Sequence, residues 1–207
     1  MLDRIQRQIE RRYDLEAGHR VSQFVVSDPE LAQNLGGSPD QSSEQLLLRQ
    51  DEQGLELALY LEPALVDGHA PLTLNQYAAA VEGVSHFTYV TFCARHDRST
   101  TQLELELQGE VDKFFALADR LSKQRESEGQ PDLRALHEQL FDRVSYRDAL
   151  DQESRDRYVT VNRLAAQVCR LWMSRYGDNL SHPGWFADAR RFYRMAQQRK
   201  LRHAAGH

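Results

Sequence analysis

Residues 84–121 read VSHFTYVTFCARHDRSTTQLELELQGEVDKFFALADRL, and the predicted fold depends on how this stretch divides into a strand and a helix. Its first ten residues are dense in aromatic and β-branched side chains on both faces, which is typical of a central strand. The residues from Ser99 onward begin with a capping box and continue with apolar side chains at helical spacing. The sequence therefore predicts a buried strand over Val84–Cys93, followed directly by a long helix.

The residues before this stretch predict the rest of a small sheet. Glu44–Gln50 and Leu55–Glu62 alternate apolar and polar side chains on either side of a short turn, so they predict an antiparallel hairpin. Val21–Val26 predicts a further short strand, and Thr73–Gln76 is a capping box that opens a helix ending at Gly83. The expected fold class is α+β, with a small, at least partly antiparallel sheet of about four strands in the N-terminal half.

The residues after the stretch predict helices only. Amphipathic spacing indicates the segments Pro131–Arg143, a short turn of helix starting at Ser145, Glu153–Tyr176, and a last helix from about Gly184. We therefore expect an α+β core domain over residues 1–126. A helical extension over residues 127–207 is expected to pack on it, so that both fold as one cooperative domain.

Length and composition bound the class of protein. With 207 residues, of which 41% are hydrophobic and 28% charged, the chain can bury a core without disulfide bonds. Two cysteines form no disulfide framework, and both lie in apolar runs, so a cytoplasmic location is expected. No apolar run approaches the roughly 20 residues that span a membrane, so no membrane partner is expected.

Glu110 is the residue that the helical pattern explains least well. At about 100° per residue it projects from within the apolar stripe of the predicted helix, where an unpaired charge is costly to bury. Lys113, one turn further on, can pair with it at the edge of the stripe, with Glu106 left solvated. The alternative is a partly buried acid, base or metal ligand in a cleft.

His86 is the expected companion of Glu110. If its face of the predicted strand met the Glu110 helix, the two side chains would come within hydrogen-bonding distance. The ordinary alternative is a core histidine satisfied by a carboxylate or a backbone carbonyl. Glu82 has the i, i+4 spacing of a ligand pair with His86, but Gly83 and the β-branched run after it argue against one helix covering both. The candidate catalytic residues are thus Glu110, His86, Glu82 and Glu106; no metal ligand or cofactor is assigned, and a divalent metal is left open.

The basic C-terminal segment is the other candidate site. From Trp185 onward six basic residues stand against one acid, a net of +5 in a chain whose total is −5, so the preceding residues carry about −10. Arg190, Arg191, Arg194 and Tyr193 offer the arginines and the aromatic ring of a nucleic-acid surface. The aromatics fall at core spacing, however, and the acidic remainder repels a polyanion, which favours docking on the chain itself or on a partner.

No motif in the sequence names a reaction, because it contains neither a nucleophile elbow nor a glycine-rich phosphate loop. The leading hypothesis is a cytoplasmic interaction or regulatory protein that binds a protein partner or associates with itself. The alternatives are a small hydrolase-like or metal-assisted enzyme using a His86/Glu110 acid–base or ligand pair, and nucleic-acid binding through the C-terminal helix. The sequence leaves open the substrate or partner, the oligomeric state, whether Glu110 is structural, and the role of the flexible Gly36–Ser43 loop.

Overall fold

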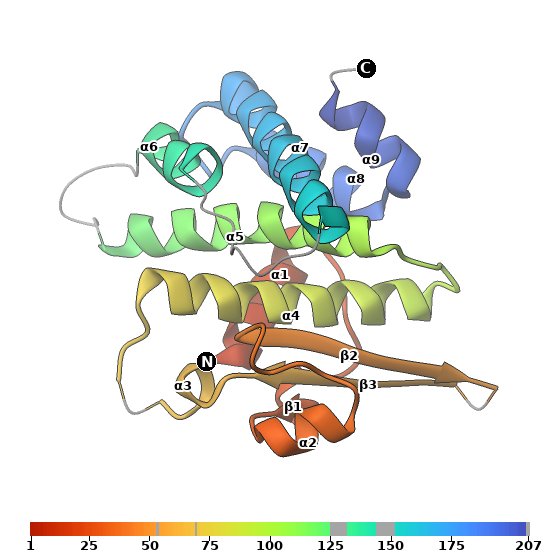
Figure 1. The fold of residues 1–207 in the computed structure, drawn as a ribbon. Coiled ribbons are helices and arrows are strands. Elements are labelled where there is room, and N and C mark those ends of the chain that lie inside the picture. Colours follow the sequence, from red (N-terminus) through yellow and green to blue (C-terminus); the bar gives the residue numbers. More distant parts are fainter. Residues whose placement is uncertain (53, 69, 125–131, 144–151, 206–207) are drawn as a thin grey trace. The chain divides into compact units, whose positions relative to one another are not determined.

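The computed structural model describes residues 1–52, 54–68, 70–124, 132–143 and 152–205 (Figure 1). The chain divides into two compact units: unit 1 comprises Met1–Arg11 and Leu15–Arg98, and unit 2 comprises Arg12–Asp14 and Ser99–His207. The fold class is α+β, as predicted, and the described strands all belong to unit 1. The predicted boundary after residue 126, between two parts expected to fold as one cooperative domain, remains a prediction.

Unit 1 contains a sheet in the order β1–β3–β2 (Figure 1). β2 (Glu44–Asp51) and β3 (Gly54–Leu61) form the antiparallel hairpin that the sequence predicts. β1 (Val25–Val26) pairs with β3 in parallel. The predicted strand over Val21–Val26 is shorter than expected, because Val21–Gln23 form a turn of 3-10 helix, η1.

Besides α4 (Leu74–Arg95), the described part of unit 1 contains α2 (Pro29–Asn34), α3 (Pro63–Val66) and most of α1 (Leu2–Tyr13). The side chain of Asp28 caps α2 by accepting hydrogen bonds from the backbone N–H groups of Glu30 and Leu31. Such a cap satisfies donors that the first turn of a helix leaves open. The last residues of α1, from Arg12 onward, belong to unit 2.

The largest correction concerns Val84–Cys93, which is helical and not a strand. Thr73 opens α4 (Leu74–Arg95) with the predicted capping box, and the helix continues through Gly83 instead of ending there. From Ala80 onward nearly every side chain of α4 is buried, whichever face of the helix it occupies. A helix buried on all faces needs apolar residues all round and shows no amphipathic period, so its composition resembles that of a central strand. The described residues therefore form three strands and not about four.

Gly83 lies where α4 comes close to the sheet. A Cβ atom built at this position would lie 3.1 Å from Leu59 and 3.2 Å from both Leu61 and Glu44 Oε2. These distances are shorter than ordinary carbon contacts of about 3.5–4.0 Å. The missing side chain therefore permits close packing of helix on sheet, and it does not mark a helix end.

All the secondary-structure elements in the described residues of unit 2 are helices. It contains α5 (Gln102–Gln124), α6 (Leu133–His137), the π-helical turn η2 (Glu138–Asp142), α7 (Gln152–Tyr176), α8 (Pro183–Arg194) and α9 (Gln197–Ala204). α7 contacts α5, α6, α8 and α9 (Figure 1). The last predicted helix is thus two helices, and the predicted turn at Ser145 lies outside the described residues.

The core of unit 2 is aromatic. The Trp172 ring lies edge-on to Trp185 at 6.2 Å and to Phe192 at 5.6 Å, and it stacks on Phe115 at 5.9 Å. All four rings are at most 1% exposed. They come from α5, α7 and α8, so this cluster joins three helices of the unit. None of the helices in the described part of the chain combines the length and apolar character that a membrane span requires.

Candidate functional site

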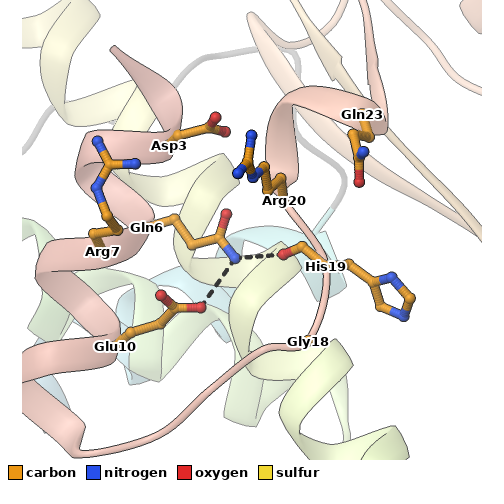
Figure 2. Close-up of a pocket in the computed structure, with 8 residues that line it drawn as sticks. All are labelled: Asp3, Gln6, Arg7, Glu10, Gly18, His19, Arg20 and Gln23. Carbon is orange, nitrogen blue, oxygen red and sulfur yellow. Dashed lines mark hydrogen bonds between the residues drawn. The ribbon is translucent and has the colours of Figure 1, made fainter.

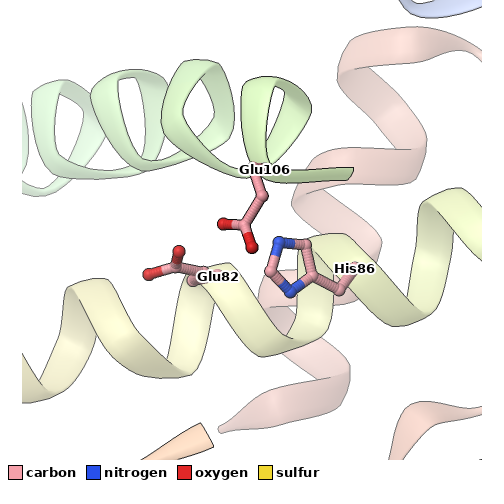
Figure 3. Close-up of side chains that lie close together, drawn as sticks. All are labelled: Glu82, His86 and Glu106. Carbon is pink, nitrogen blue, oxygen red and sulfur yellow. The ribbon is translucent and has the colours of Figure 1, made fainter. Parts of the chain in front are cut away.

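Glu82 and His86 lie on the same side of α4, one helical turn apart (Figure 3). A carboxylate oxygen of Glu82 and a ring nitrogen of His86 are within 4.8 Å of each other. The sequence argued against this pair because Gly83 predicts a helix end and the β-branched run after it predicts a strand. Since one helix covers both residues, the i, i+4 ligand geometry is present after all.

Glu44, the first residue of β2, lies beside His86 within unit 1. Its Oε2 atom lies 3.6 Å from Nδ1 of His86, and the His86 and Glu44 side chains are only 9% and 13% exposed. Among the described residues no group donates a hydrogen bond to this buried oxygen. Buried carboxylate oxygens normally have a hydrogen-bond partner, so this Glu44 oxygen is unusual, and His86 is the positively chargeable group beside it.

Glu44 is not among the candidate site residues predicted from the sequence, although its place in the strand pattern is unusual. Glu44 has the same strand parity as Leu46 and Leu48, and in the observed register it is opposite Leu61. An acid in phase with an apolar strand face is the strand equivalent of Glu110 on its helical stripe. The strand position of Glu44 identifies it as an unusual acid, but it does not predict that its carboxylate contacts α4.

The three side chains form a mixed nitrogen and oxygen donor set. One imidazole and two carboxylates suit Zn²⁺, Mn²⁺ or Fe²⁺, whereas Ca²⁺ and Mg²⁺ prefer oxygen ligands alone. Metal bonds of about 2.1 Å place neighbouring donor atoms roughly 3.0–3.4 Å apart. The observed separations from His86 are 3.6 Å to Glu44 and at most 4.8 Å to Glu82, both longer than this spacing, so binding one ion requires the side chains to move inward.

Glu110 forms the ion pair predicted from its spacing. Nζ of Lys113 lies 2.7 Å from Oε1 of Glu110, and the two side chains are 13% and 16% exposed. Glu106 was expected to be solvated, and this is wrong, because it is 7% exposed. The buried surface of α5 is wider than the predicted stripe and includes polar side chains such as Gln108. The predicted meeting of Glu110 with His86 concerns residues of different units and remains a prediction.

The aromatic residue of the predicted nucleic-acid surface is inside unit 2. Tyr193 is fully buried, and its ring stacks on that of Tyr13 with 4.2 Å between the centroids. The face of Tyr193 is therefore occupied by another ring in this structure. Base stacking of the kind predicted for this residue would require that contact to open.

Two of the predicted arginines bind backbone carbonyls at the end of α1. Arg194 donates to the carbonyl oxygens of Tyr13 and Asp14, both at 2.8 Å, and Arg190 donates to that of Arg12 at 3.2 Å. These carbonyls are among those that a helix end leaves without intrahelical partners. The basic segment thus makes intramolecular contacts within unit 2, whereas the third arginine, Arg191, is exposed.

A buried polar network lies beside these arginines. The Tyr13 hydroxyl donates to Asp112 in a short hydrogen bond and accepts one from Gln108 at 3.0 Å. The Gln108 amide oxygen accepts from Nζ of Lys200 at 2.8 Å, and Lys200 is fully buried. Burial, and after it the Asp112 carboxylate, raises the pKa of Tyr13 well above 10.0. Lys200, one of the six basic residues counted from Trp185 onward, is a core residue.

A polar pocket of about 440 Å³ lies in unit 1 between α1 and residues 18–23 (Figure 2). Gln6 donates from its amide nitrogen to the carbonyl of His19 at 2.6 Å and to Glu10 at 3.1 Å. Its amide oxygen accepts from the N–H of Val21 at 2.8 Å. These bonds attach the segment after α1 to the helix, so the pocket lining has a structural role.

A larger hollow of about 820 Å³ lies beside α6, η2 and α7 in unit 2. His137 on its wall has Nε2 at 2.9 Å from the carbonyl oxygen of Ala166, which can only accept, so Nε2 is the donor. The walls include the acids Asp132 and Asp142 together with Arg170. Because both signs of charge are present, this hollow does not select one charge of ligand.

Comparisons with known proteins do not extend this description. A scan against protein-family models and searches of curated proteins and of solved structures found no match to this chain. The functional inference therefore rests on the side chains of the chain itself.

Proposed function

We propose that this chain is an interaction or regulatory protein whose unit 1 binds one divalent transition-metal ion at Glu44, Glu82 and His86. The observation that supports this most directly is the position of His86, which has a carboxylate 3.6 Å away from β2 and another within 4.8 Å on its own helix. The imidazole and the two carboxylates each offer a donor atom to a divalent cation, and the cation's charge would offset the cost of burying the carboxylates.

Metal binding would connect two elements that are distant in the sequence. Glu44 begins β2, and Glu82 and His86 lie on α4, so one ion would fasten the sheet to the helix that covers it. A ligand that binds only the folded state adds stability that grows with its free concentration, about 2.7 kcal/mol at one hundred times the dissociation constant. The metal would therefore regulate how firmly β2 is held, and this is the regulatory role that we propose.

The donor set predicts an order of metal affinity. Imidazole favours Zn²⁺ over Mn²⁺, and a site with one nitrogen donor gives Mg²⁺ and Ca²⁺ little advantage. We expect one equivalent of Zn²⁺ to bind, Mn²⁺ to bind more weakly, and Mg²⁺ to compete poorly. An order with Mg²⁺ or Ca²⁺ first would indicate an all-oxygen site elsewhere.

The test is isothermal titration of the full chain, first stripped of metal with a chelator, by Zn²⁺. Glu44→Gln, Glu82→Gln and His86→Gln should each weaken binding at least about tenfold, since each removes one donor. His96→Gln is the matched control, because His96 is an exposed histidine just after the end of the same helix. Absence of saturable binding, or equal binding by the parent and the three variants, would contradict the proposal.

The same variants separate a metal site from a purely structural ion pair between His86 and Glu44. If the pair is only structural, Glu44→Gln lowers stability in the presence of a chelator and added Zn²⁺ changes nothing. If the site binds metal, Zn²⁺ raises the midpoint of thermal unfolding of the parent and of His96→Gln. It does not raise that of Glu44→Gln or His86→Gln.

A further inference from the structure

We propose that β2 is a self-association edge, on which the β2 strand of a second copy pairs in antiparallel orientation to form a six-stranded sheet. This names a partner for the interaction role proposed above, and it does not depend on metal binding. β2 lies at one end of the strand order β1–β3–β2 (Figure 1). No strand of the described residues lies on its outer side, and an open edge of this length is a template for pairing.

The backbone parity of β2 shows which groups face outward. The N–H of Glu62 donates to the carbonyl of Ser43 at 2.8 Å, so this pair is of the hydrogen-bonded kind. Hydrogen-bonded and non-hydrogen-bonded pairs alternate along an antiparallel ladder. In the observed register, Glu44, Leu46, Leu48 and Gln50 therefore direct their N–H and C=O groups away from β3.

The same strand positions direct side chains to the apolar face of the hairpin. Leu46 is opposite Leu59 and Leu48 is opposite Leu57 in the register. α4 approaches this face near Glu44, at the end away from the turn. Toward the turn, Leu48 is 47% exposed and Leu55 is 37% exposed, so the leucine face is partly uncovered there.

The charges of β2 favour an antiparallel second copy. Pairing centred on Leu47 places Leu46 opposite the partner's Leu48 and Arg49 opposite the partner's Gln45, with no like charges opposite each other. It also uses Leu46 and Leu48 in hydrogen-bonded pairs, whereas pairing at Glu44 would require its N–H and C=O to give up their bonds with the Ser42 hydroxyl. Parallel pairing in register would instead place Arg49 opposite the partner's Arg49 and Glu44 opposite the partner's Glu44.

This arrangement also covers one of the exposed leucines. A twofold axis perpendicular to the sheet at Leu47 brings the partner's Glu44 end beside the turn end of β2. The partner's α4 lies over its own Glu44 end, on the same face of the sheet, because both copies are identical. Leu48 would then lie beside the partner's Leu46 and would lose exposed surface, whereas Leu55 lies one strand further away, on β3.

The test is sedimentation velocity of the full chain across concentrations from about 1 to 300 µM, with circular dichroism as the check of folding. The parent should dimerise, and Leu48→Lys should shift the dissociation constant upward at least about tenfold. Leu48→Pro should do the same, since it removes an outward N–H and leaves the bonds to β3 intact. Leu31→Lys is the matched control, because Leu31 is 45% exposed on α2, and it should dimerise like the parent.

Cysteine cross-linking tests the register. In the Leu47→Cys variant, the cysteine lies opposite the same cysteine of the partner in a non-hydrogen-bonded pair. Cα atoms in such a pair are about 4.5 Å apart, a distance that a disulfide bond can span. Arg49→Cys faces the partner's Gln45 and should cross-link at least about tenfold more slowly. A parent that is monomeric at every concentration would overturn the proposal, as would Leu48 variants that dimerise like the parent. Equal cross-linking rates of the two cysteine variants would overturn the register. None of these outcomes bears on Zn²⁺ binding, so the two proposals fail separately.

Discussion

Replacing Gly83 with alanine tests the packing that brings Glu44 to α4. In the interior of a solvated helix, this change stabilises the helix by about 1 kcal/mol. Here the new methyl group would lie 3.1–3.2 Å from Leu59, Leu61 and Glu44 Oε2, so these neighbours must move by a few tenths of an ångström. Overpacking of this kind costs about 1–3 kcal/mol. We therefore expect Gly83→Ala to leave the free energy of unfolding unchanged or to lower it by up to about 2 kcal/mol.

Urea unfolding, followed by circular dichroism in the presence of a chelator, measures this change. Ala79→Gly, at a half-buried position one turn earlier on the same helix, reports helix propensity alone and should cost about 1 kcal/mol. In the metal titration, Gly83→Ala should also weaken Zn²⁺ binding, because the methyl group displaces the Glu44 carboxylate. A gain of about 1 kcal/mol together with unchanged Zn²⁺ affinity would refute this description of the packing.

Three further changes test unit 2. Because the pKa of Tyr13 is raised well above 10.0 in the folded state, the stability it contributes is fully present below pH 10 and is lost as the pH rises above 10. In the unmodified chain, the free energy of unfolding should fall by up to about 1.4 kcal/mol per pH unit above pH 10, measured by urea unfolding from about pH 9 to 11. Tyr13→Phe should make this dependence on pH weaker. An equal dependence on pH in both proteins would argue against a buried phenol. Lys200→Met should lower the free energy of unfolding by about 1–3 kcal/mol, because it leaves a buried amide oxygen without its donor, and a gain would contradict the network. Arg194→Gln should cost about 1 kcal/mol through two lost bonds, and Arg191→Gln less than about 0.5 kcal/mol; similar losses would contradict the helix-end contacts.

The hairpin and the amphipathic helices could be predicted from the sequence because their apolar residues recur with a regular period. The alternation of Leu55–Leu61 identifies β3, and the capping box and stripe after Ser99 identify α5. α4 could not be identified in the same way. It is buried on all faces, so its residues have no amphipathic period, and its valines, threonines and aromatics have high strand propensity.

This one error also determined the interpretation of the site. Glu82 and His86 are both candidates from the sequence, but Gly83 and the β-branched run after it argue against one helix covering the pair. In the structure Gly83 accommodates the sheet, and the same glycine admits Glu44 to the cluster. The contact between the first residue of β2 and the middle of α4 is tertiary, so no local pattern predicts it.

The central claim is that His86, Glu44 and Glu82 share one divalent ion. X-ray absorption at the zinc edge, on the full chain loaded with one equivalent of Zn²⁺, tests it most directly. The proposed site predicts nitrogen and oxygen donors only, at about 2.0–2.2 Å, with the outer-shell signal of a single imidazole that disappears in His86→Gln. Sulfur scattering at about 2.3 Å, which would indicate a cysteine such as Cys93, or an imidazole signal that persists in His86→Gln, would contradict it.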